Sequence, residues 1–281
     1  MPFTPITAEK VSTTVLRQIE MLILQGVLRP GARLPAEREL AARLDVSRPT
    51  VREALAKLEE KGLIAVRPGG GAFVAEVLGS AFAPPLIELF ATHDAALFDY
   101  LEFRRDLEGL AASRAATRAT EADKDVIRSV FERMKDAHTE KSPDAEAAID
   151  AEFHMAIFEA AHNVVMLHMA RSLYELLRRG VFYNRRATYA EQDSRDQLLA
   201  QHEAIHDAVL SGEPTRARGA VEAHLDFVKL HLMNVERVRS REEVAKLRRD
   251  QEAACDARVM ANAEREDREV YANLIVSFAA G

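Results

Sequence analysis

Residues 47–58, SRPTVREALAKL, constrain the fold of this chain more than any other stretch. Their apolar side chains recur at i, i+3, i+4 and i+7, a spacing that puts them on one face of an α-helix. These side chains are Val51, Ala54, Leu55 and Leu58. Ser47 suits the N-cap, Pro49 is tolerated in the first turn, and Gly62 suits the C-terminal cap. The stretch therefore predicts a short amphipathic helix.

Two further helices are predicted upstream of this one. A stripe of apolar residues stops at Gly26 and has helical spacing; it consists of Val11, Val15, Ile19, Leu22 and Ile23. A loop then leads to a second short helix over 36–44, which Asp45 interrupts. Two short helices separated by a tight turn are typical of a helix-turn-helix.

A β-hairpin is predicted directly after the third helix. Short apolar runs over 63–67 and 72–75 flank the turn PGGG at 68–71. The glycines do not suit a nucleotide-binding loop, because they lack the strand-then-helix context and the Lys-Ser/Thr ending. Three helices and a hairpin predict a winged helix-turn-helix. The alternative is an ordinary small helical subdomain with a solvated basic face.

Charge is distributed unevenly along the chain. Residues 1–76 hold 11 Lys/Arg and 9 Asp/Glu, a net charge of +2, whereas the remainder carries a net charge of −9. Because the basic excess is small, specific contacts from Arg38, Arg48 and Arg52 matter more than bulk attraction to DNA. An arginine at the start of such a helix reaches phosphates or pairs with guanine.

Length and composition limit the class of protein. At 281 residues the chain is long enough for two domains with complete cores. Its one cysteine, Cys255, excludes an intrachain disulfide and favours a reducing compartment. No apolar run approaches the roughly 18 residues that cross a membrane, and the N-terminus lacks a signal pattern. We therefore expect a soluble cytoplasmic protein with no membrane partner.

From about residue 95 to 240 the sequence has helical character. Glycine is scarce, alanine and leucine are common, and alternating β-branched runs are absent. Helices are predicted over 97–107, 121–137, 145–161, 163–179, 195–210 and 214–239. The fold class is therefore mainly α, with an all-α bundle of six or seven helices after the winged helix.

Four side chains in the predicted bundle have the chemistry of metal ligands. Asp150 and His154 are four residues apart and share one helix face, while His202 and His224 fall on later helices. One carboxylate and three imidazoles would form a site with open positions. Spacing alone leaves two alternatives open. Asp150 and His154 can be a surface pair, or His202 and His206 can be the pair that matters.

Arg104 lies close to the apolar stripe of the first bundle helix. An arginine that faces a bundle interior needs an anionic partner, because an unpaired buried charge is costly. Glu108, one turn further along, is one candidate partner. The carboxylate of a bound small acid is the other.

Two sets of motifs resemble the GntR-type bacterial transcription regulators of the FadR subfamily. The first is LPAEREL at 34–40, VSRPTVREAL at 46–55 and the glycine turn. The second is DAEFH at 150–154, AHN at 161–163, QHEAI at 201–205 and AHL at 223–225. Together they cover roughly residues 8–238. LIELF at 86–90 and YLEFRRDLEG at 100–109 are similar to the regulators of pyruvate, L-lactate and glycolate metabolism.

The resemblance implies a homodimer in which each winged helix binds one half of a palindromic operator in double-stranded DNA. Positions matching the family's DNA-contacting helices are Arg38, Ser47, Arg48, Thr50 and Arg52. Gly69 matches the tip of the wing, which enters the minor groove.

The resemblance also implies a C-terminal metal- and effector-binding (FCD) domain. The residues that match the family's metal ligands are Asp150, His154, His202 and His224, with zinc expected ahead of nickel or manganese. Arg104 matches an arginine that receives the effector's carboxylate, and His206 falls where the family varies. The implied protein is a repressor controlled by a 2-hydroxy or 2-oxo acid of the lactate, pyruvate or glycolate type. A sugar acid or dicarboxylate is the alternative effector, and a metal-dependent hydrolase or lyase is a remote alternative function.

These inferences divide the chain into four segments. We expect the winged helix over 8–76, a linker over 77–92, the metal- and effector-binding domain over 93–240, and a tail over 241–281. The resemblance does not cover the tail. It begins with a charged helical pattern over 241–269, which either adds a helix to the bundle or frays.

Overall fold

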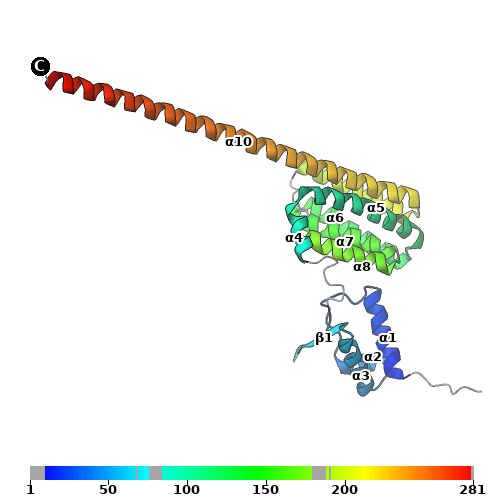
Figure 1. Cartoon of the computed structure of the whole chain (residues 1–281). Coiled ribbons are helices and arrows are strands. Elements are labelled where there is room, and N and C mark those ends of the chain that lie inside the picture. Colours follow the sequence, from blue (N-terminus) through cyan, green and yellow to red (C-terminus); the bar gives the residue numbers. More distant parts are fainter. Residues whose placement is uncertain (1–9, 68, 76–83, 179–187, 190, 280–281) are drawn as a thin grey trace, which may run out of the picture. The chain divides into compact units, whose positions relative to one another are not determined.

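The computed structural model describes residues 10–67, 69–75, 84–178, 188–189 and 191–279 (Figure 1). It begins with three helices, α1 (Val11–Leu24), α2 (Glu37–Leu44) and α3 (Arg48–Glu60). A two-stranded sheet of β1 (Ile64–Arg67) and β2 (Gly71–Val74) follows. The predicted winged helix-turn-helix is therefore confirmed.

Helix α3 forms where the sequence predicted it. The Ser47 side chain accepts a hydrogen bond from the Thr50 backbone N–H at 3.3 Å, which caps the first turn. Beyond the C-terminal end, Gly62 has φ +70°, the left-handed conformation that glycine adopts without strain. The predicted stripe of Val51, Ala54, Leu55 and Leu58 is buried.

Helix α1 packs against α3 and supplies much of the remaining core of this part. Of the five residues predicted to face the core, Val15, Ile19 and Ile23 are buried and Leu22 is half-buried. Val11 is exposed, and Leu16 is buried in its stead. Val11 therefore faces solvent, whereas Ser12 in the same turn is buried.

The hairpin pairs antiparallel, with Ile64 opposite Val74 and Arg67 opposite Gly71. A single bridge from Arg33 to Phe73 adds the loop before α2 to the open edge. At the tip, Gly69 has φ +69°, a conformation that a side chain would strain. These contacts tie the wing to the helix-turn-helix.

The second part of the chain is entirely helical within the described residues. Its helices are α4 (Pro84–Thr92), α5 (Asp94–Arg118), α6 (Glu121–Thr139), α7 (Pro143–Ala160), α8 (Val164–Arg178), α9 (Gln192–Leu210) and α10 (Pro214–Ala279). The expected helical bundle is confirmed. Helix α4 occupies the second half of the predicted linker, whereas residues 77–83 of that linker lie outside the described residues. So do residues 8, 9 and 76 at the ends of the predicted winged-helix segment, and residue 179 at the predicted end of the fourth bundle helix.

Helix α7 is the central helix of the bundle. It contacts α5, α6 and α8, and it buries side chains on several sides, among them Phe153, Ile157 and Phe158. Asp150 and His154 lie among these packed faces and are held away from water, whereas Glu152 lies on the exposed face of the same helix.

Helix α10 does not end near residue 239, so the predicted end of that helix is wrong, and the charged helical pattern over 241–269 belongs to the same helix. It continues as one helix to Ala279. The sequence from 220 to 280 contains no glycine or proline to stop it. Charge pairs along the helix, such as Arg239 with Glu236 and Glu243, stabilise it further.

Residues from Val228 onward form a compact unit of their own. No helix among the described residues combines the length and hydropathy of a membrane span.

Candidate metal centre and nucleic-acid interface

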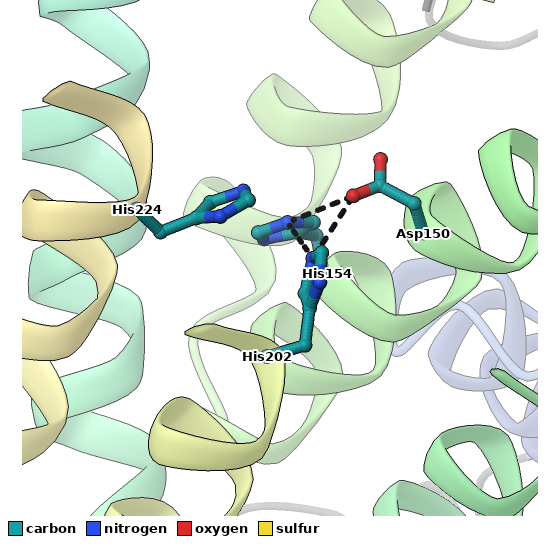
Figure 2. Close-up of side chains that lie close together, drawn as sticks. All are labelled: Asp150, His154, His202 and His224. Atoms are coloured by element: carbon teal, nitrogen blue, oxygen red, sulfur yellow. Dashed lines mark hydrogen bonds and ion pairs between the residues drawn. The ribbon is translucent and has the colours of Figure 1, made fainter. Parts of the chain in front are cut away.

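Three helices bring four buried side chains together (Figure 2). Asp150 and His154 project from the same face of α7, His202 comes from α9 and His224 from α10. One ligand atom from each residue lies within 4.8 Å of the others. All four residues are buried, so water cannot readily screen or satisfy them. The tertiary structure thus brings together the four residues that the resemblance implies as metal ligands.

The distances in the cluster suit ligands of one cation. His202 Nε2 lies 3.4 Å from His154 Nε2 and 3.0 Å from Asp150 Oδ1. Two nitrogen ligands of a tetrahedral zinc ion are roughly 3.3 Å apart, given Zn–N bonds of about 2.0–2.1 Å. Two facing imidazole nitrogens that both carry lone pairs repel each other unless a cation or a proton lies between them. The cluster could therefore hold a metal ion.

Each histidine has a separate partner for its other ring nitrogen. His202 Nδ1 lies 2.7 Å from the Leu198 carbonyl oxygen, and His224 Nδ1 lies 3.0 Å from Gln201 Oε1. His154 Nδ1 lies 2.7 Å from Glu108 Oε2. All three partners are acceptors, so they favour a proton on Nδ1 and leave Nε2 as a ligand atom.

The electrostatics of the cluster favour neutral imidazoles at two of the three positions. Burial lowers the pKa of His202, and it lowers that of His224 well below its usual value, helped by the nearby charges of His202 and His154. Burial also acts to lower the pKa of His154, but the Glu108 and Asp150 carboxylates together outweigh it and the pKa is raised. One carboxylate with three imidazoles is a donor set for zinc, nickel or manganese.

Arg104 points into the bundle and is buried, and its partner in this structure is Glu108. Arg104 Nε lies 2.6 Å from Glu108 Oε1, and Arg104 donates through Nη2 to the Tyr174 hydroxyl at 3.0 Å. Burial acts to raise the pKa of Glu108, but the charges of Arg104 and His154 hold it well below its usual value. Glu108, the first of the two partners considered from the sequence, therefore pairs with Arg104.

His206 lies outside the cluster, although it is one turn from His202 on α9. Its ring stacks on Phe131 at 4.6 Å between centroids, and its Nδ1 lies 2.9 Å from Asp207 Oδ1. The pair formed by His202 and His206 is therefore not the one that matters here. The His206 side chain is also partly exposed, which agrees with a residue that does not bind metal.

The predicted DNA-contacting residues lie on the outer side of α2, α3 and the wing. Arg38, Arg48 and Arg52 are exposed, as are Ser47 and the wing residue Gly69, while Thr50 is half-buried. Arg52 pairs with Glu37 at the start of α2 through Nη2 to Oε2 at 2.8 Å and Nε to Oε1 at 3.2 Å. This bond raises the pKa of Arg52 and lowers that of Glu37.

Sequence reasoning missed the residues that surround the four candidate ligands. Gln201 and Glu108 contact histidine Nδ1 atoms, and Tyr189 donates to Asp150 Oδ1 at 3.2 Å. Glu108 was considered as a partner of Arg104, one turn away, and its contact with His154 could not be read from spacing. Gln201 is adjacent to His202 and carried no separate signal.

The fold and site define a class of protein: a winged-helix DNA-binding domain joined to a helical domain with a buried carboxylate–imidazole cluster. The chain belongs to the GntR family of bacterial regulatory proteins and carries an FCD domain. The GntR family matches residues 11–74, and the FCD domain matches residues 99–227. It is therefore a DNA-binding transcription regulator.

Relatives of known name agree with this assignment. The chain is 38% identical over 227 residues to the putative L-lactate dehydrogenase operon regulatory protein of Escherichia coli K12, covering 79% of this chain and 86% of that protein. It is 37% identical over 229 residues to the Glc operon transcriptional activator of the same strain, covering 80% and 90%. These relatives are regulators, so the hydrolase or lyase alternative is not supported.

Proposed function

We propose that this chain is a homodimeric repressor whose binding to a palindromic operator is controlled by a small 2-hydroxy or 2-oxo acid. The observation that carries the proposal is the buried cluster of Asp150, His154, His202 and His224, with Arg104 linked to His154 through Glu108. Relatives named for an L-lactate dehydrogenase operon and the Glc operon support the choice of acid. As a bacterial transcription regulator, the protein would act in the cytoplasm.

Asp150, His154, His202 and His224 would hold a divalent metal ion, with zinc expected first. Such an ion, when bound, supplies coordination for an oxygen-rich anion. The chain's own contribution is to aim three Nε2 atoms at one point and to exclude water from it. Because the ligand side chains are already fixed, metal binding would lose less side-chain conformational entropy.

Arg104 is the residue that would pair with the carboxylate of the acid. One carboxyl group separates the guanidinium from the cluster, because Glu108 lies 2.6 Å from Arg104 Nε through Oε1 and 2.7 Å from His154 Nδ1 through Oε2. A guanidinium pairs with a carboxylate through parallel hydrogen bonds. Because Arg104 already pairs with Glu108, the acid has to share or replace that contact.

Arg38, Ser47, Arg48, Thr50, Arg52 and Gly69 would form the contacts with operator DNA. The exposed arginines, the capped start of α3 and the glycine at the wing tip support this assignment. Binding of the acid would shift the balance between two states of the dimer. An effector does this only through its differential affinity for the two states, typically about 1–3 kcal/mol.

The test is thermal unfolding of the metal-free protein with zinc and with small acids added. Zinc at a hundredfold excess over its Kd contributes about 2.7 kcal/mol, which is a rise in Tm of roughly 5–10 °C for a domain of this size. L-lactate, pyruvate or glycolate should raise Tm further and release operator DNA in a mobility-shift assay. Chelator should abolish both effects.

The matched control is a pair of histidine variants on α9. His202→Ala should lose the zinc-dependent rise in Tm, whereas His206→Ala should keep it, because only His202 lies in the cluster. If a sugar acid or dicarboxylate shifts Tm and the 2-hydroxy and 2-oxo acids do not, the proposed effector class is wrong. If no bound acid changes operator affinity, effector control itself is wrong.

A further inference from the structure

Glu108 is a buried carboxylate on α5 that contacts three other side chains at once. Its Oε1 lies 2.6 Å from Arg104 Nε and accepts a hydrogen bond from the Tyr174 hydroxyl at 2.9 Å. Its Oε2 lies 2.7 Å from His154 Nδ1. Glu108 is only 2% exposed, so these side chains, and not bulk water, decide what the carboxylate does.

The contact with His154 determines which ring nitrogen faces the metal centre. A carboxylate oxygen and an imidazole lone pair only 2.7 Å apart would repel each other, so this contact favours a proton on Nδ1 of the ring. In the neutral ring, which is the form that binds a metal, Nε2 then carries the lone pair, and this atom lies 3.4 Å from His202 Nε2 and 3.5 Å from Asp150 Oδ1. Carboxylates in this position orient histidine ligands and make them more basic.

The same carboxylate is the partner of the arginine that we assign to effector binding. Arg104 Nε and His154 Nδ1 contact opposite oxygens of one carboxyl group. A carboxylate that binds Arg104 therefore competes with Glu108, and any movement of Glu108 acts on a ring of the candidate metal cluster.

We propose that Glu108 is a positioning residue that holds His154 in its metal-binding tautomer and links that ring to Arg104. The inference rests on the proposed metal site and extends it by one residue. Glu108 touches neither the metal nor the acid. Its role is to transmit the state of Arg104 to His154 through a shared carboxyl group.

A second buried glutamate in the same bundle provides a matched control. Glu146 on α7 is also 2% exposed and pairs with a buried arginine, with 2.5 Å between its Oε1 and Arg195 Nη2. Its other oxygen lies 3.3 Å from His138 Nδ1, and His138 is outside the cluster. Glu146 therefore shares the burial and the charge pairing of Glu108 but contacts none of the four candidate ligands.

The experiment compares zinc affinity of wild type, Glu108→Gln and Glu146→Gln by competition with a chelator, alongside their Tm values without metal. A glutamine can donate as well as accept, so it no longer enforces one tautomer of His154. Glu108→Gln should weaken zinc binding by about 10–100-fold, the usual effect of losing such a partner. The zinc affinity of Glu146→Gln should stay within about threefold of wild type, even if its Tm falls as far as that of Glu108→Gln.

Two results would overturn the inference. One is a Glu108→Gln variant that binds zinc as tightly as wild type, and the other is an equal loss of affinity in both variants. Should Glu108→Gln fail to fold, nitrogen NMR of the zinc-loaded wild type with labelled histidine decides the question. A proton on Nε2 of His154, instead of on Nδ1, would contradict the proposal. A wild type that binds no zinc would instead refute the proposed metal site.

Discussion

At the scale of single residues, Arg52 illustrates how a DNA-binding surface is prepared in the free protein. It is exposed on α3 and bonds to Glu37 on α2 through two of its nitrogens. Exposed ion pairs of this kind contribute little to stability, because solvent screens them. The pair therefore orients the guanidinium at little cost, and a DNA phosphate or guanine can displace Glu37.

We expect Arg52→Ala to weaken operator binding by about 1–3 kcal/mol, the usual value for an arginine that pairs with a base. The measurement is a titration of labelled operator, repeated with random DNA at the same salt concentration. Arg43→Ala is the control, since Arg43 is also exposed and pairs with a glutamate, Glu39. Equal losses on operator and random DNA would show that Arg52 contacts only phosphates.

Glu37→Gln removes the charge that competes with DNA for Arg52. We expect affinity for random DNA to rise by up to about fivefold, which corresponds to the upper limit of an exposed ion pair. Affinity for the operator should rise less, because Glu37 no longer orients the arginine. The same titrations measure both, and a larger gain on operator than on random DNA would show that Glu37 only repels DNA.

At the scale of elements, helix α6 shows how local bonds decide where a bundle helix begins. Thr120 and Asp123 form a reciprocal capping box, in which Asp123 Oδ2 accepts from the Thr120 backbone N–H at 2.8 Å. His162, at the turn after α7, lies 2.8 Å from the same oxygen. Burial acts to raise the pKa of Asp123, but the bonds from Thr120 and His162 outweigh it and lower that pKa.

Asp123→Asn should lower the free energy of unfolding by about 1–2 kcal/mol at pH 7, because a charged acceptor at the helix N-terminus is lost. A carboxyl group with a lowered pKa stabilises the fold above its unfolded pKa of about 4, and the effect disappears as pH falls through the folded value. The difference between variant and wild type should therefore shrink between pH 5 and pH 3 in urea unfolding. Asp125→Asn, at an exposed position in the same helix, should change little at either pH.

At the scale of the whole molecule, the two core clusters and the extended end of α10 have different roles. Each of the two helical parts has its own buried core. In contrast, residues 237–252 of α10 are all exposed, including Val238, Val244 and Leu247. A helix that buries nothing gains no stability from packing, so this stretch depends on helix propensity and charge pairs.

Truncation after Ser240 should therefore leave the two cores intact. We expect Tm to change by less than about 2 °C and zinc affinity to be unchanged, since surface alterations usually stay within about 0.5 kcal/mol. Thermal unfolding and chelator competition on the shortened chain give both values. A clear fall in Tm, or a change of oligomeric state in sedimentation, would show that the end of α10 contacts a second copy.

Much of the fold could be predicted from sequence because its signals are local. Ser47, Thr120 and Asp45 mark helix ends through bonds and dihedral angles that involve only a few neighbouring residues. The period of the α-helix also determines that Asp150 and His154 share a face, whatever surrounds them. The end of α10 was predicted wrongly because a charged, breaker-free sequence carries no local sign of where packing stops.

The composition of the candidate site depended on long-range packing. His202 and His206 have the same spacing signal, and only the orientation of α9 against α5 and α6 brings His202 into the cluster. Arg104 had two acceptable partners, and the buried pair with Glu108 is formed because both side chains face the same interior. The sequence by itself determined helices, caps and the Asp150–His154 pair, since these follow from backbone geometry. Tertiary structure alone decided which residues from separate helices meet, because that depends on how whole helix faces pack.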